Sequence, residues 1–367
     1  MRIGILTFVN ASNYGAVLQA YASQKFLNDA GYDAELINYT PLPKNSNHTA
    51  PGILNKIKNK ISLIKHPFKF INRKKKNNKF DKFKNMYLKI SPNKYVGEIS
   101  ELKEPYDIII AGSDQIWNTD LSFASESFFL NFKTSAKKTG YAISVGRETY
   151  SELDCRMIHK NIGNFEKLSV RENSLKEYLQ KHENIESQVV CDPVFLLDKR
   201  VWDKISLTPK KSNYILVYTM EHNETLVKII NKLKNLTQKE VFFIYGGGNL
   251  NKENKIPGKM ITGIGPDEFT GWIKNADIVL TNSFHGAAFS IIFKRKLFIL
   301  EHSTRNERLT QLADICGYKD RLINIKLNDF EIEKYIIDSN TAYKNLNMFI
   351  KQSKDYMLSI CQECKNE

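Results

Sequence analysis

The stretch RIGILTFVNASNYGAVLQAYASQKFLNDAGYDAELINY, residues 2–39, decides the fold class. Residues 2–8 form a continuous apolar run, which is typical of a strand buried on both faces. Apolar residues then recur at helical spacing over residues 16–27, and Gly31 is placed to end a helix. Residues 34–39 predict a second strand. A strand, a helix and a strand in this order indicate a crossover between parallel strands, the repeating unit of α/β proteins.

The same alternation continues in two blocks, which a polar linker ending in LTPKKSN (207–213) separates. Further strands are expected over residues 106–111, 139–144, 167–171, 188–191, 214–220, 240–245, 260–262, 277–281 and 296–300. We therefore predict an α/β chain of two Rossmann-like lobes facing a cleft, a glycosyltransferase-B-like arrangement. The predicted lobes span residues 1–195 and 210–340. A final helix at about 340–367 would be able to pack back on the first lobe.

Residues 41–94 interrupt this rhythm and carry most of the charge. Residues 54–94 hold fourteen Lys or Arg and one acid, Asp81, so 14 − 1 = +13 of the net charge of +14 lies there. Apolar residues recur among these lysines at helical spacing, which predicts an inserted pair of basic amphipathic helices. Such helices suit the anionic inner face of a membrane. A solvated face whose apolar stripe packs on the first lobe is the alternative. No nucleic-acid-binding motif is present, and no nucleic-acid partner is expected.

Composition excludes several classes of protein. Hydrophobic residues make up 42% and aromatic residues 11% of 367 residues, which is enough for two cores and unlike a disordered chain. The N-terminus has no signal-peptide pattern and no run approaches the roughly 18 apolar residues of a membrane helix, so a cytoplasmic protein is expected. The five cysteines are scattered as in a reduced protein. Cys361 and Cys364 have no second pair nearby, and no metal site is expected.

One motif follows an expected strand and precedes an apolar helix: TNSFHGA, residues 281–287. Ser283 is placed as an N-cap, so the backbone N–H groups of the first turn would be available to an anion. Gly286 would let a ligand approach the backbone, and His285 would supply a proton or a positive charge. A capped helix with a structurally satisfied histidine explains the same residues equally well.

Two polar loops provide further candidates. GSDQIWN (112–118) follows a strand directly and includes Asp114, Gln115, Trp117 and Asn118. This density of polar groups favours a ligand-facing loop over a turn around a buried tryptophan. SNYG (12–15) includes Asn13 and Tyr14 and has a single glycine. It is therefore not a dinucleotide-binding fingerprint, although it is placed to line a cleft.

Arginine is scarce in this basic chain, so its positions are informative. Arg171 ends one expected strand and Arg147 follows another, while Arg305 and Arg308 open the helix after residue 300. Guanidinium groups suit bidentate recognition of carboxylate and phosphate. A surface salt bridge is the alternative for any one of them.

Several blocks together resemble one known family. Taken in order, they resemble the signature blocks of the polysaccharide pyruvyl transferases: RIGILTFVNASNYGAVLQAYA, YDIIIAGSDQIWN, SVREN, VVCDPVFLL and TNSFHGAAFSIIF. The resemblance runs from Arg2 to about Phe293, with the basic insertion as its most variable part. It implies two lobes and the transfer of a pyruvyl group from phosphoenolpyruvate to two sugar hydroxyls, which makes a cyclic ketal in capsular or exopolysaccharide synthesis.

The resemblance implies roles for Arg171 and His285, and the roles of the other residues are expected from the groups that such a reaction requires. The arginine of the SVREN block, Arg171, would bind the donor together with Arg305, Arg308, Ser283 and Gly286. His285 would act as acid or phosphate ligand, and Asp114 as base or sugar-binding carboxylate. The acceptor would contact Asn13, Tyr14, Gln115, Trp117 and Asn118. Phosphoenolpyruvate is a co-substrate, and no cofactor or metal is implied.

One position departs from the family pattern. Relatives often read S-R-L-H-G, with an arginine two residues before the histidine, where this chain has Ser283. Either Arg305 or Arg308 replaces that charge, or the chain uses another donor. A glycosyltransferase with a nucleotide-sugar donor, with Glu301 as a candidate ribose partner, and a polysaccharide-assembly protein without catalysis are the alternatives. The acceptor sugar in the favoured function would be free or linked to a polyprenyl diphosphate.

Overall fold

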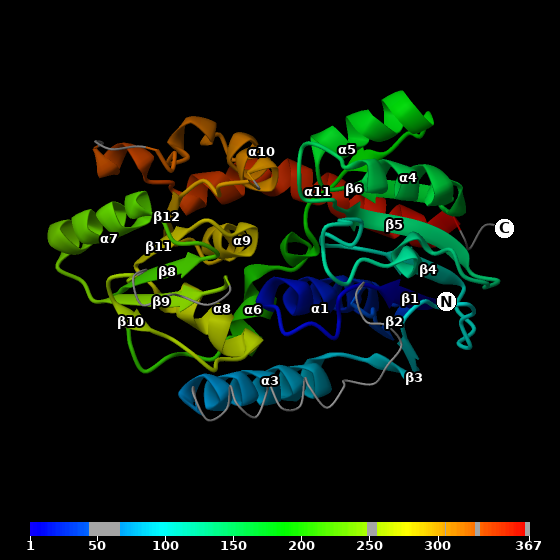
Figure 1. The fold of residues 1–367 in the computed structure, drawn as a ribbon, viewed down its shortest axis with the longest axis horizontal. Helices are drawn as coiled ribbons and strands as arrows, with labels where there is room; N and C mark the ends of the chain where they lie inside the picture. The colour runs from blue at the N-terminus through cyan, green and yellow to red at the C-terminus, as the bar shows by residue number, and fades with distance from the viewer. Residues whose placement is uncertain (44–66, 248–254, 305, 327–330, 364–367) are drawn as a thin grey trace. The chain divides into compact units, whose positions relative to one another are not determined.

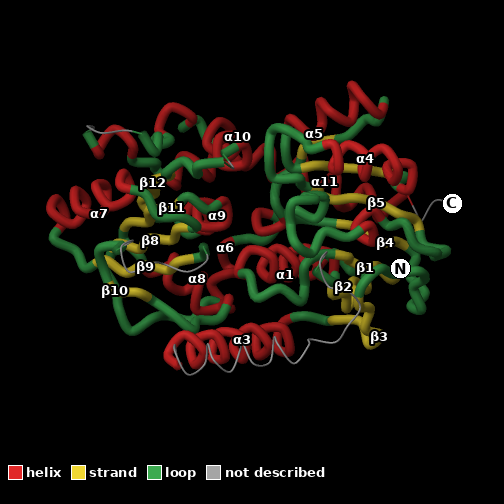
Figure 2. Tube along the Cα trace, in the orientation of Figure 1, coloured by secondary structure: helices red, strands yellow, loops and turns green. Residues whose placement is uncertain are grey.

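The computed structural model describes residues 1–43, 67–247, 255–304, 306–326 and 331–363. The chain separates into two compact units. The first contains residues 1–145, 151–168 and 262–266, and the second contains residues 146–150, 169–261 and 267–367. The sequence-based boundary between residues 195 and 210 falls inside the second unit. Figure 1 and Figure 2 show the helices and strands of each unit.

The first unit is built on a parallel sheet with the strand order β3-β2-β1-β4-β5-β6. Its elements are β1 (Arg2–Leu6), α1 (Tyr14–Asp29), β2 (Asp33–Thr40), α3 (Pro67–Tyr87), β3 (Ile90–Val96), β4 (Ile108–Ala111), β5 (Lys137–Ile143), α4 (Glu152–Asn161) and β6 (Lys167–Val170). The predicted β-α-β opening is present. Gly31 follows the end of α1 with a φ of 87°, a conformation that glycine adopts without strain.

The predicted helical insertion differs from the structure at its end. Its first helix lies outside the described residues, its second helix is present as α3, and its last residues form a strand instead. Residues 90–96 are the edge strand β3, which pairs in parallel with β2. This strand has polar residues at alternating positions and contains Pro92, both of which an edge tolerates.

Helix α3 uses its apolar stripe to pack on the first unit. Phe80 and Phe83 are each 1% exposed. The ring of Phe80 lies 5.2 Å from that of Tyr14, and the ring of Phe83 lies 6.1 Å from that of Tyr21, both on α1. The stripe is therefore part of the core, as the alternative reading of the insertion expected. The exposed residues of α3 include Lys74, Lys75 and Lys82, and also the apolar Phe70, Ile71 and Met86.

The second unit contains a five-stranded parallel sheet with the order β10-β9-β8-β11-β12. The strands of this sheet are β8 (Ile215–Thr219), β9 (Val241–Tyr245), β10 (Lys259–Met260), β11 (Ile278–Thr281) and β12 (Lys296–Ile299). The unit also contains β7 (Gln188–Val189), the last strand of the other sheet. Strand β7 pairs with the end of β6 at Ser169 and Val170. The helices are α5 (Asn173–Tyr178), α6 (Lys199–Ile205), α7 (Glu224–Thr237), α8 (Pro266–Asn275), α9 (Phe284–Ile292), α10 (Glu307–Ile315) and α11 (Ser339–Glu363).

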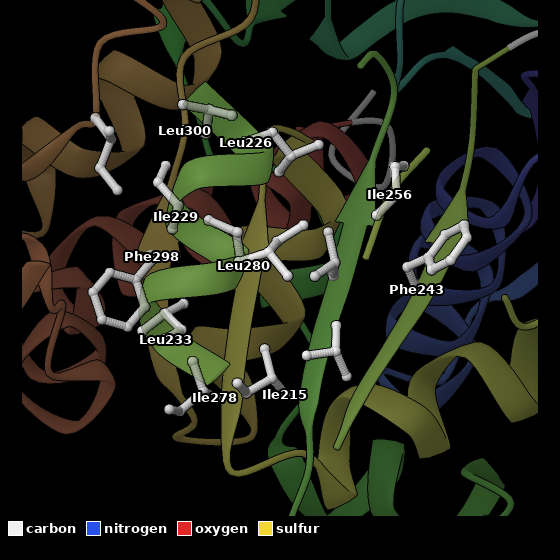
Figure 3. Close-up of a cluster of buried hydrophobic side chains, with 14 of the residues drawn as sticks. Ile215, Leu226, Ile229, Leu233, Phe243, Ile256, Ile278, Leu280, Phe298 and Leu300 are labelled. Carbon is white, nitrogen blue, oxygen red and sulfur yellow. The ribbon is translucent and has the colours of Figure 1, made fainter. Parts of the chain in front are cut away.

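The core of this unit lies between α7 and the sheet. Leu226, Ile229 and Leu233 of α7 pack on strand residues such as Ile215 and Leu280, as Figure 3 shows. On another side, α9 packs on β11 and β12 and against α11. Because α9 is held by two strands and a helix, its first turn has a fixed position at the carboxyl end of β11. None of the helices in the described part of the chain combines the length and hydropathy of a transmembrane span.

Candidate functional site

The loop between β11 and α9 is fastened to the end of β8. The hydroxyl of Thr281 donates to the carbonyl of Tyr218 at 2.6 Å and accepts the backbone N–H of Ser283 at 3.0 Å. The side-chain oxygen of Asn282 accepts the N–H of Met220 at 2.8 Å. Thr281 and Asn282 therefore hold the loop, which presents the next residues of the motif in one arrangement.

The first turn of α9 differs from the predicted cap. Ser283 occupies the N-cap position, but its side chain accepts no hydrogen bond from the helix. A Cβ on Gly286 would lie 2.4 Å from the Thr281 hydroxyl and 2.9 Å from the Tyr218 ring. Glycine is needed here because α9 packs closely on the two strands, which is a different reason from the ligand approach that we expected.

A buried carboxylate joins two of the predicted donor residues. Asp192 Oδ2 lies 2.8 Å from Nη1 of Arg171 and 3.5 Å from Nε2 of His285. The Asp192 side chain is 0% exposed, and those of Arg171 and His285 are 2% and 11% exposed. Oδ1 of Asp192 accepts the N–H of Val194 at 3.0 Å. One carboxylate therefore contacts both cationic candidates.

The ionisation of Asp192 follows from these neighbours. Burial by itself raises the pKa of the Asp192 carboxyl. Arg171, His285 and the Val194 N–H outweigh burial, and the pKa is lowered from 3.8 to about 2. Asp192 is therefore a carboxylate at neutral pH.

The ring of Phe284 contacts two guanidinium groups. Its ring centroid lies 4.4 Å from Cζ of Arg171 and 5.9 Å from Cζ of Arg308, within the range of cation–π contacts. Arg171, Asp192, Phe284 and Arg308 line a cavity of about 30 Å³. That volume holds roughly one or two water molecules.

Side chains of helix α10 form hydrogen bonds with the segment after β6, next to this cavity. Gln311 donates to the carbonyl of Arg171 at 2.8 Å and accepts the N–H of Asn173 at 3.0 Å. Glu307 accepts the N–H of Ser174 at 3.1 Å. Arg308 stands in the first turn of the same helix, which begins at Glu307. Arg305 lies outside the described residues.

The loop 112–118 of the first unit is more buried than expected. Trp117 is 1% exposed, stacks on Phe129 at 4.6 Å, and donates to the carbonyl of Phe128 at 3.4 Å. Direct contact of this ring with an acceptor would require it to leave the core. Asp114 is partly exposed and adopts a φ of 75°.

The remaining acceptor candidates also have structural contacts. Gln115 is 9% and Asn118 is 2% exposed, and Asn118 accepts the N–H of Asp120 at 3.0 Å. Asn13 is exposed and caps α1 by accepting the N–H of Ala16 at 3.2 Å. Tyr14, 6% exposed, packs against Phe80 of α3. Of the candidates in this unit, Asn13 and Asp114 present the most accessible polar groups.

Comparison with known families decides the identity. The family model described as polysaccharide pyruvyl transferase matches residues 13–304, which is most of the chain. The first strand, Ser12, Arg305 and Arg308 lie outside the matched range. The chain belongs to the polysaccharide pyruvyl transferase family. The comparison with curated proteins found no match.

Solved structures show the same class of fold. A Listeria monocytogenes protein assigned as a UDP-N-acetylglucosamine 2-epimerase is 10% identical, covers 97% of this chain and 90% of its own, and has a TM-score of 0.50. The Methanocaldococcus jannaschii UDP-GlcNAc 2-epimerase in complex with UDP-GlcNAc and UDP is 14% identical over 99% of this chain and 100% of its own, with a TM-score of 0.49. At such identities the Listeria protein supports a glycosyltransferase-B-like fold, and neither likeness bears on activity.

Two features of this pyruvyl transferase family member were missed in the sequence. The first feature is Asp192, which lies in the block VVCDPVFLL. No sequence pattern around it indicates that it contacts residues distant in the chain, such as His285. The second feature is a cluster at the ends of β8 and β12, where Glu221 accepts the backbone N–H of Ser303 at 2.6 Å and its hydroxyl at 2.8 Å. His302 Nε2 lies 3.7 Å from the Glu221 carboxylate. The run EHS after a predicted strand was the available signal.

Proposed function

We propose that this family member transfers a pyruvyl group from phosphoenolpyruvate to two hydroxyls of one sugar, forming a cyclic ketal in capsular or exopolysaccharide synthesis. The observation that carries the proposal is the cluster of His285, Arg171 and Arg308 around Phe284, at the carboxyl end of β11. An imidazole and two guanidinium groups are the groups that an anionic donor requires.

The reaction assigns a task to each group. The methylene carbon of phosphoenolpyruvate must gain a proton while positive charge develops at C2, to which a sugar oxygen adds. A second hydroxyl then displaces phosphate. His285 is proposed as the acid, because it is a titratable residue in the first turn of α9. Asp114 is proposed as the base or sugar-binding carboxylate, and Asn13 as an acceptor contact. The scheme uses phosphoenolpyruvate as co-substrate and needs no cofactor or metal.

Arg308 is proposed as the replacement for the arginine that relatives often carry at the position of Ser283. It lines the same cavity as Arg171 and stands over the ring of Phe284, the residue next to Ser283. Arg171 is almost fully buried and paired with Asp192, whereas Arg308 is only partly buried. We therefore assign the direct contact with the donor's carboxylate or phosphate to Arg308. Because the cavity has room for little more than water, its lining must move apart to admit the donor.

The acceptor is proposed to be membrane-associated. Sugars in polysaccharide assembly can be carried on a lipid diphosphate, and the exposed lysines of α3 give the first unit a charged face suited to anionic lipid. Since Phe80 and Phe83 of α3 are buried, this contact would rest mainly on the lysines of the helix and would be peripheral, at the cytoplasmic face.

A thermal-shift comparison tests the donor. Phosphoenolpyruvate should raise the melting temperature of the protein in a concentration-dependent way, since a ligand that binds only the folded state stabilises it. A panel of nucleotide sugars should leave it unchanged. Stabilisation by a nucleotide sugar and not by phosphoenolpyruvate would instead favour a glycosyltransferase.

A further inference from the structure

The Asp192 carboxylate faces one particular ring nitrogen of His285. Of the two ring nitrogens, it is Nε2 that lies 3.5 Å from Oδ2 of Asp192. The same oxygen lies 2.8 Å from Nη1 of Arg171. Contacts of this length in catalytic pairs commonly shorten when substrate binds. Because an ionised carboxylate only accepts hydrogen bonds, a hydrogen bond across this contact needs a proton on Nε2.

The carboxylate is itself fixed from its other side. Oδ1 of Asp192 accepts the N–H of Val194, and the carbonyl of Val194 accepts the indole N–H of Trp202 at 3.1 Å. The Trp202 side chain is fully buried and contacts Phe289 of α9 at 4.8 Å between ring centroids. Asp192 is therefore anchored to the same helix that carries His285, which limits the relative movement of the two side chains.

We propose that Asp192 is a positioning residue of this enzyme, which fixes His285 through Nε2 and leaves Nδ1 as the nitrogen that exchanges a proton with the donor. This inference rests on the proposed function. The Asp192 side chain has no exposed surface in this structure, and its proposed effect on the reaction is exerted through His285.

The proton then has a defined path. The Nδ1–H bond of the imidazolium breaks as a C–H bond forms at the methylene carbon of phosphoenolpyruvate, and the first hydroxyl oxygen bonds to C2. The proton of that hydroxyl returns to Nδ1, directly or through a base, while Nε2 keeps its proton against Asp192. The second hydroxyl forms the other C–O bond as the C–O bond to phosphate breaks, and its proton leaves with phosphate. Each turnover restores the imidazolium.

Two measurements separate the positioning role from the activity. The first uses the wild-type protein without donor, with histidine labelled with ¹⁵N in the ring and His285 assigned by loss of its signals in His285→Asn. Neutral His285 should carry its proton on Nε2, with a bare Nδ1. A proton on Nδ1 would overturn the proposal whatever the enzyme's substrates are.

The second measurement is turnover of Asp192→Asn, which keeps the side-chain shape. We expect kcat to fall about 100-fold with little change in KM for phosphoenolpyruvate, and the solvent deuterium isotope effect on kcat to rise as proton transfer limits turnover. Asp198→Asn, an exposed helix cap in the same unit, is the matched control and should leave both unchanged. An unaltered isotope effect in a folded Asp192→Asn protein would contradict the proposal. If this variant does not fold, the tautomer of His285 in the wild-type protein still tests the positioning role of Asp192. If the wild-type protein transfers no pyruvyl group, the proposed function fails while the tautomer result stands.

Discussion

At the scale of single residues, one carboxylate organises the charged side chains of the candidate site. Asp192 binds Arg171 within the second unit and contacts His285 from the first turn of α9. A buried charge without a partner is costly, so the ionised form of Asp192 depends on these neighbours. The ion pair with Asp192 in turn offsets part of the cost of burying the Arg171 side chain.

The depressed pKa of Asp192 predicts a loss of stability in acid. Its folded pKa of about 2 lies below the unfolded value of 3.8, so its contribution is complete above about pH 4 and is lost as pH falls toward 2. That contribution is on the order of 2 kcal/mol. Urea unfolding of wild type and Asp192→Asn between pH 5 and pH 2 measures it. The difference in unfolding free energy between wild type and Asp192→Asn should become smaller as pH falls. A difference that does not change with pH would contradict the low pKa of Asp192.

Glu307 predicts the opposite dependence near neutrality. Burial, with smaller contributions from Glu172 and Glu148, raises the pKa of Glu307 to about 7, although hydrogen bonding to Ser174 opposes the shift. Its contribution to stability is therefore complete below the unfolded value of 4.5 and is lost as pH rises through about 7. Glu307→Gln should become more stable relative to wild type as pH rises from 5 to 8, measured by unfolding free energy. A relative stability that does not change with pH would refute this.

At the scale of elements, most strands were predictable because parallel strands buried on both faces are continuous apolar runs. The structure shortens several of them by one or two residues, as at Ile108–Ala111 within the predicted 106–111. Strand β3 was not predictable, since an edge strand with alternating polar residues lacks that signal. The prediction that the Ser283 side chain caps α9 was wrong. The Thr281 hydroxyl accepts the Ser283 N–H, and packing on β8 and β11 positions the first turn of α9.

The close packing of α9 predicts a cost for filling Gly286. A methyl group there would meet Thr281 and Tyr218, so Gly286→Ala should shift the start of α9 and destabilise the protein by about 1 to 3 kcal/mol. Gly163→Ala is the matched control, because a Cβ at that position meets nothing within 4 Å. Unfolding free energies of the two variants give the comparison, and equal effects would show that α9 is not held as described.

The exposed face of α3 predicts binding to anionic vesicles at low salt. Each lysine near such a surface contributes about 1 kcal/mol, so replacing Lys74, Lys75 and Lys82 by glutamine should weaken partitioning roughly a hundredfold. Replacing three exposed lysines elsewhere in the first unit, Lys103, Lys133 and Lys160, controls for net charge. Co-sedimentation with phosphatidylserine vesicles is the measurement. Equal loss in both variants, or no binding by wild type, would rule out docking through α3.

At the scale of the whole molecule, the order of motifs along the chain predicted the fold and the family, because each motif follows a strand of a repeating α/β pattern. The composition of the site was only partly predictable. His285 and Arg171 lie in recognisable blocks, but their shared partner Asp192 belongs to a third block. No periodicity links residues so far apart, and only the folded second unit brings them together.

The reaction product shows whether this protein transfers a pyruvyl group from phosphoenolpyruvate. The protein is incubated with phosphoenolpyruvate and a panel of sugar acceptors, free and lipid-linked, and the products are analysed by mass spectrometry and NMR. We predict an acceptor heavier by one pyruvate less one water, a ketal carbon bonded to two sugar oxygens, one phosphate released per transfer, and loss of product in His285→Ala. Full product formation by His285→Ala would remove His285 from the chemistry. An acceptor that instead gains a sugar from a nucleotide-sugar donor would contradict the account.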